Sequence, residues 1–215
     1  MTATLTVPDV AERPARRAAT PSSPVTDNRP VYVAWGAAWA VGYGAMALGS
    51  GPSPVADLPT FLPVTLLAVG LVGAAVVTGV ATARAQRGVT GGAKVAGTMI
   101  GTAWAIGFTA LFLLITGLTA VVGDQHVQSV LWPTGSALVV GLLYLAGGAV
   151  NRDVLQYALG AWIALVGTAA VFLDTPGLHT VLATAGAGGY AVAAALEPRR
   201  LAAVVHAART DAAAA

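Results

Sequence analysis

Six apolar segments separated by short polar joints constrain this chain of 215 residues more than any other feature. The segments are residues 31–48, 61–83, 95–118, 130–150, 155–173 and 178–196. A helix needs about 20 apolar residues to cross the hydrocarbon core of a bilayer, and each segment is near or above that length. Backbone polar groups inside a bilayer must bond to one another, which favours helices. The sequence therefore predicts an all-α, polytopic transmembrane bundle of six helices over residues 30–197.

The composition excludes several other classes of protein. Only 9% of the residues are charged and 56% are hydrophobic, and the mean hydropathy is +0.75. A soluble domain of this length would need a more highly charged surface. The formal net charge is only +2 and the basic residues form no stripe, so we expect no nucleic-acid partner. The chain has no cysteine, which excludes disulfides, thiolate metal sites and cysteine nucleophiles.

The basic residues predict how the bundle is oriented. All eleven Lys and Arg residues lie outside the apolar segments. The joints after the second and fourth segments carry Arg84, Arg87, Lys94 and Arg152, whereas the joints after the first, third and fifth segments carry none. Short cytoplasmic joints are enriched in Lys and Arg. We therefore expect a multi-pass protein of the inner (plasma) membrane with both termini in the cytoplasm.

The two ends of the chain differ in composition from the bundle. Residues 1–29 are rich in proline and arginine and contain no apolar run that could serve as a signal peptide. They are expected to form a disordered cytoplasmic tail. Glu197 begins the sequence Glu-Pro-Arg-Arg, which is typical of the cytoplasmic end of a membrane segment. Residues 198–215 are expected to form either a cytoplasmic tail or a helix lying on the membrane surface.

A short internal repeat suggests that the bundle is built from three hairpins. The sequence AWAVGY at 38–43 resembles AWAIGF at 103–108, and residues 161–164 give a fainter match. Odd segments run in the same direction, so the pattern predicts three parallel two-helix repeats, although alanine-rich helices also match by chance. Trp39 and Trp104 lie midway along their segments. They either pack the interior or, with Tyr144, line a central path for an apolar or cationic solute.

The sequence offers few groups for catalysis or ion coupling. We expect no Asp, Glu, Lys, Arg or His well inside a segment, which argues against proton or sodium coupling and against an intramembrane protease. The sequence has no glycine-rich phosphate loop with a lysine, so no nucleotide hydrolysis is expected. We therefore predict no catalytic residue, no cofactor and no metal site, and we do not expect an enzyme.

The outer joints carry the polar side chains of greatest interest. Each of them has one acidic residue, namely Asp57, Asp124 or Asp174, and His126 and His179 lie on the same side. Three acids around one opening could attract cations, and His with Asp could bind zinc or copper. Alternatively, these acids cap or solvate helix ends, and Asp174-Thr-Pro-Gly is typical of a turn.

Two local patterns give further predictions. Gly97, Gly101 and Ala105 form a stripe of small residues that favours close helix packing, either within the chain or between two copies. Asn151-Arg152-Asp153 is predicted to be a tight turn in which Asp153 caps the fifth helix. The same polar joint could alternatively contact a cytoplasmic partner.

A resemblance adds to this interpretation. The sequence from Tyr157 through Trp162, with Pro176-Gly-Leu-His and Ala185-Gly-Ala-Gly-Gly, resembles small uncharacterised six-helix integral membrane proteins of actinobacteria. Some of these are labelled permeases, which implies a small transport component without its own ATPase or a buried ion-coupling residue. The alternative is a non-transporting membrane scaffold or sensor subunit that acts through its cytoplasmic tails. The expected partners are the lipid bilayer and either further copies of the chain or another subunit.

Overall fold

The protein is almost entirely helical in the computed structural model, which describes residues 26–124 and 126–213. Its α-helices are α1 (Arg29–Gly49), α2 (Phe61–Ala85), α3 (Gly91–Val122), α4 (His126–Asn151), α5 (Val154–Ala169), α6 (Thr175–Val181) and α7 (Ala187–Ala213). The all-α prediction is confirmed. Five helical spans are long and apolar enough to cross a membrane, namely α1 to α4 and α5 with the 3-10 turn η1 (Ala170–Phe172). The tail expected over residues 1–29 lies outside the described residues, apart from 26–29.

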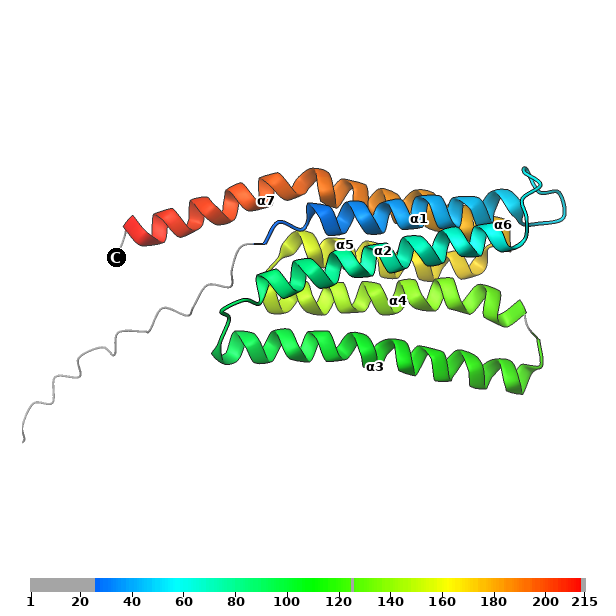
Figure 1. Ribbon diagram of the computed structural model, residues 1–215, viewed down its shortest axis with the longest axis horizontal. Coiled ribbons are helices and arrows are strands. Elements are labelled where there is room, and N and C mark those ends of the chain that lie inside the picture. The colour runs from blue at the N-terminus through cyan, green and yellow to red at the C-terminus, as the bar shows by residue number, and fades with distance from the viewer. Residues whose placement is uncertain (1–25, 125, 214–215) are drawn as a thin grey trace, which may run out of the picture.

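The last apolar segment belongs to a longer helical rod than the sequence suggests. A π-helical turn, η2 (Leu182–Gly186), joins α6 to α7, and the three elements follow one another without a break. Pro198 lies inside α7, where it removes one backbone N–H donor without ending the helix. The helix therefore continues past Glu197, where the sequence suggested that the membrane domain ends. Figure 1 shows α7 continuing past the end of the other helices.

The helices run alternately in opposite directions along one elongated bundle. Figure 1 shows the α1–α2 and α3–α4 joints at one end, near α6. The α2–α3 and α4–α5 joints, together with the described start of the chain, lie at the opposite end. Because of this alternation, every described Lys and Arg lies at or beyond that opposite end, from Arg29 to Arg209. This arrangement agrees with the sequence, in which joints that carry Lys and Arg alternate with joints that carry none.

Glycine permits the closest helix contact, which is between α4 and α5. A Cβ atom added at Gly141 would lie 2.5 Å from the backbone N of Ala164. One added at Gly160 would lie 2.5 Å from the backbone N of Leu145. Small residues let helix backbones approach in this way and maximise van der Waals contact between them. The two helices thus pack so closely that Gly141 and Gly160 leave no room for a side chain of their own.

The outer surfaces of α2 and α3 are apolar and largely exposed. Ala74 is the buried residue of α2, and Leu111 and Ile115 are the buried residues of α3. Exposed apolar surface of this extent is unfavourable in water and suits contact with lipid. The stripe on α3 lines an open groove beside α2, where a Cβ at Gly101 would meet no atom within 4 Å but one at Gly97 would lie 2.6 Å from Gln86 Nε2.

Candidate functional site

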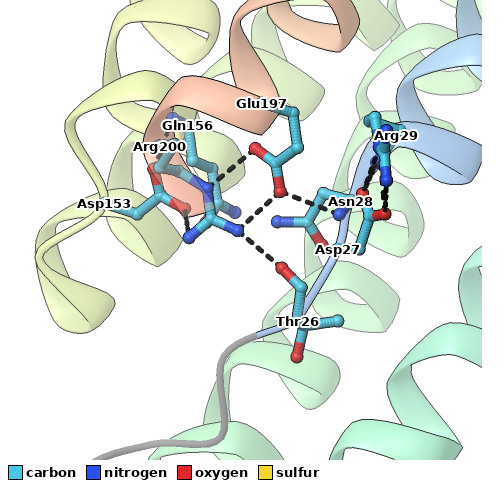
Figure 2. A network of polar contacts seen from close by, with 8 residues as sticks. All are labelled: Thr26, Asp27, Asn28, Arg29, Asp153, Gln156, Glu197 and Arg200. Carbon is cyan, nitrogen blue, oxygen red and sulfur yellow. Dashed lines mark hydrogen bonds and ion pairs between the residues drawn. The ribbon is translucent and has the colours of Figure 1, made fainter. Parts of the chain in front are cut away.

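A network of charged groups joins three separate parts of the chain at the end of the bundle where the described chain begins. Figure 2 shows its members, which come from the segment before α1 (Thr26 and Asn28), the α4–α5 turn (Asp153) and α7 (Glu197 and Arg200). We call these five residues the Arg200 network. Glu197 is fully buried and Asp153 is 8% exposed, so both carboxylates are removed from solvent.

The Arg200 guanidinium makes the central contacts of this network. Its Nε donates to Glu197 Oε2 at 2.7 Å and its Nη2 donates to Glu197 Oε1 at 2.5 Å, which gives a two-pronged pair. Nη2 also donates to the carbonyl oxygen of Thr26 at 2.5 Å, and Nη1 lies 3.2 Å from Asp153 Oδ2. One side chain of α7 therefore fastens the start of α1 and the α4–α5 turn to the same point.

The network holds two carboxylates and one guanidinium, and backbone N–H groups stabilise the excess negative charge. Glu197 Oε1 accepts the N–H of Asn28, which is the N-cap of α1, at 2.9 Å. Asp153 is the N-cap of α5, and its Oδ1 accepts the N–H of Gln156 at 3.0 Å. Helix N-termini carry partial positive charge and unpaired N–H donors. Each carboxylate thus lies where a helix begins, and the predicted capping role of Asp153 is confirmed.

Charge pairing at this end of the bundle favours the ionised forms of Arg200 and Asp27. Hydrogen bonds to Glu197, followed by the nearby Asp153 charge, raise the pKa of Arg200 above its usual value. Beside the network, hydrogen bonds from Arg29 lower the pKa of the Asp27 carboxyl. The Asp27–Arg29 pair is exposed and contributes little to stability. Removal of Arg200 would cost more, because it would leave the buried carboxylates of Glu197 and Asp153 without their partner.

A chain of aromatic rings crosses the bundle interior. Its members, in order of contact, are Phe108, Trp104, Tyr144, Tyr190, Trp39, Tyr43 and His179. Neighbouring ring centroids lie 5.5–6.2 Å apart. Most of these pairs are edge-to-face, an arrangement that aromatic quadrupoles favour. We call these seven residues the aromatic chain.

The three predicted path residues all belong to the aromatic chain. Trp39 and Tyr144 are 3% and 7% exposed, and Trp104 is half-buried. Trp39 and Trp104 are linked through the rings of Tyr144 and Tyr190. These contacts match the alternative in which the tryptophans pack the interior.

Three polar atoms in the interior have no hydrogen-bond partner among the described residues. They are the hydroxyls of Tyr32 and Tyr190 and the Nδ1 atom of His179. His179 lies near a helix end, as the sequence suggested, yet it is only 7% exposed because it stacks on Tyr43. Buried polar groups without partners are uncommon in proteins, and bound water frequently satisfies them.

The three acids of the outer joints remain at the surface. Asp57, Asp124 and Asp174 are exposed, and they lie in joints at one end of the bundle. Asp174 caps α6 by accepting the N–H of Gly177 at 3.0 Å, which confirms the alternative that this acid caps a helix end; Thr175, Pro176 and Gly177 begin the helix instead of forming a separate turn. Asp124 accepts the N–H of His126 at 2.8 Å. Within residues 26–124 and 126–213, no group of three His, Cys, Asp or Glu side chains is arranged to hold a metal ion.

No protein-family model, curated protein or solved structure matches the chain. Sequence reasoning missed the central roles of Glu197, Arg200 and Tyr190. One local signal pointed to the Glu197–Arg200 pair, since an acid followed three residues later by an arginine on a helix is a pairing motif. Their contacts with residues about 170 positions earlier carry no local sequence signal.

Proposed function

We propose that the protein is a multi-pass plasma-membrane protein in which six helical rods cross the bilayer and both termini lie in the cytoplasm. Five spans meet the length and composition needed to cross a membrane. The rod of α6, η2 and α7 is proposed as the sixth crossing. The exposed apolar surfaces of α2 and α3 support contact with lipid. The described basic residues lie at one end, which supports the cytoplasmic assignment of that end.

The proposal also includes the three parallel two-helix repeats that the sequence suggests. The three repeat tryptophans have different surroundings, because Trp39 is buried, Trp104 is half-buried and Trp162 is 47% exposed. The Trp162 indole donates to the carbonyl of Ala185 in the π-helical turn at 2.8 Å. Any duplication has therefore been followed by divergence of these positions.

We propose that the protein works as a membrane scaffold or sensor subunit through its cytoplasmic helix. The Arg200 network carries this proposal, because it fixes α7 to the start of α1 and to the α4–α5 turn just before α7 leaves the bundle. Beyond Arg200, the described side chains from 202 to 210 are exposed. A rigidly anchored and exposed helix suits the binding of a cytoplasmic partner.

Removal of residues 201–215 tests this function. We expect the truncated protein to keep the melting midpoint of the full chain in mild detergent, because every residue of the Arg200 network remains. We expect it to lose a partner that co-purifies with the full chain in stoichiometric amount. The control is Val204→Gln with Val205→Gln, which keeps the helix length but removes its exposed apolar side chains. A partner that binds the truncated and full chains equally would contradict the proposal.

A small transport component without its own ATPase is the second candidate. The observation that favours it is a set of buried polar atoms, on Tyr32, Tyr190 and His179, that have no hydrogen-bond partner in the described part of the chain and could contact water or a polar solute. If the full chain purifies only with copies of itself, this candidate becomes the stronger one. Solute flux into liposomes, compared between the full chain and Tyr190→Phe, is then the relevant measurement.

A further inference from the structure

A groove on the outside of the bundle combines an apolar wall with two arginines. It lies between α2 and the segment that leads into α1, with a volume of about 620 Å³, within the range of sites that hold organic ligands. Its α2 wall includes Val76, Val77 and Val80, and its end is formed by Arg84 and Arg87.

Helix geometry places Arg84 in line with the valines. Val77, Val80 and Arg84 follow one another at intervals of three and four residues within α2, and Arg87 lies in the turn just after α2 ends at Ala85. Residues at these spacings lie on one face of a helix. The groove therefore changes from apolar to cationic along one face of α2 and into the turn that follows it, toward the end of the bundle.

The positive charge of this groove is not balanced by a carboxylate within the described residues. The three ion pairs there are Arg29–Asp27, Arg200–Asp153 and Arg200–Glu197, and none involves Arg84 or Arg87. Asp27 also lines the groove, but Arg29 already pairs with it. Among the described residues, Arg84 and Arg87 therefore have no ion-pair partner and are suited to an anionic ligand.

We propose that this groove binds an anionic phospholipid, with the headgroup phosphate on Arg84 and Arg87 and an acyl chain along the valine wall. Guanidinium groups bind phosphate through paired hydrogen bonds. Basic pockets between helices at the cytoplasmic side of a membrane are suited to anionic headgroups. A free phosphate ion would use the arginines but would gain nothing from Val76, Val77 and Val80.

The groove's second wall connects this site to the Arg200 network. Thr26 and Asp27 form part of that wall. The same segment is held by the bond from Arg200 to the Thr26 carbonyl and by the bond from the Asn28 N–H to Glu197. The wall is therefore fixed in position before a lipid binds, which reduces the entropic cost of binding.

Lipid titration of the full-length protein in a neutral detergent tests this site. The probes are phosphatidylglycerol, phosphatidylcholine and inorganic phosphate, with binding followed by native mass spectrometry. We expect phosphatidylglycerol to bind more tightly than phosphatidylcholine. Each basic residue near an anionic headgroup contributes about 1 kcal/mol to binding. The double variant Arg84→Gln with Arg87→Gln should therefore weaken phosphatidylglycerol binding roughly thirtyfold.

Two matched variants separate a built groove from general surface charge. Arg199→Gln with Arg209→Gln removes two exposed charges from α7, and we expect it to keep the affinity of the wild type. Val80→Trp fills the groove without changing charge, and we expect it to weaken phosphatidylglycerol binding. Any one of four results would overturn the proposal. The first two are equal binding of both lipids and equal losses of affinity in the two arginine variants. The other two are unchanged phosphatidylglycerol binding in Val80→Trp and competition by millimolar phosphate.

Discussion

Replacing Arg200 by methionine is expected to lower the melting midpoint of the detergent-solubilised protein by about 6–20 °C. The change removes the partner of two buried carboxylates, Glu197 and Asp153. Breaking a buried ion pair in this way costs about 3–5 kcal/mol, because an uncompensated charge remains in the interior. For a chain of this size, each kcal/mol shifts the midpoint by roughly 2–4 °C. The start of α1 also loses its link to α7 through the Thr26 carbonyl.

Matched variants show whether the loss arises from the buried charge. Arg199→Met removes a neighbouring exposed arginine and should change stability by no more than about 0.5 kcal/mol. Glu197→Gln with Arg200→Met should recover a large part of the loss, since it removes the most buried unpaired carboxylate. A melting midpoint for Arg200→Met that equals the midpoint for Arg199→Met would show that the network contributes no stability.

Alanine at Gly141 should have the second largest effect. Its Cβ would lie 2.5 Å from a backbone nitrogen and 2.7 Å from a backbone oxygen of α5, and neither atom moves without displacing the helix. Overpacking of this kind costs about 1–3 kcal/mol or more. The measurement is the melting midpoint in detergent, which should fall by several degrees even though alanine favours helices over glycine.

Gly101→Ala provides the same chemical change without the contact. A Cβ at Gly101 would meet no atom within 4 Å, so the variant should be neutral or slightly more stable, by up to about 1 kcal/mol. Equal midpoints for the two alanine variants would mean that α4 and α5 do not cross as closely as described. A large loss in Gly101→Ala alone would instead point to close packing of α3 in the assembled protein.

The sequence predicts the helical content and the alternating joints well, because apolar length and helix-capping residues are local signals. Five of the six segments lie within continuous helical elements, the fifth extends one residue past η1, and the caps at Asp153 and Asp174 form as predicted. These features depend on residues within a few positions of one another, so a single stretch of chain is enough to reveal them.

Long-range partners could not be predicted in the same way. Glu197 looks like the polar boundary of a segment, yet it is buried because it bonds to Arg200 and to the Asn28 N–H from the other end of the chain. His179 lies near a helix start, but a ring from α1, Tyr43, covers it. The stripe at Gly97 and Gly101 predicts close packing, and it does not specify whether the neighbour belongs to the same chain.

Cysteine labelling in intact cells tests the proposed membrane topology most directly. The chain has no cysteine, so single substitutions report without background. Asp57→Cys and Asp124→Cys lie in exposed joints at one end, while Thr90→Cys and Ala207→Cys lie in the α2–α3 joint and the α7 extension. An impermeant thiol reagent should label the first pair in intact cells and the second pair only after the membrane is opened. Labelling of Thr90→Cys or Ala207→Cys in intact cells would contradict the account.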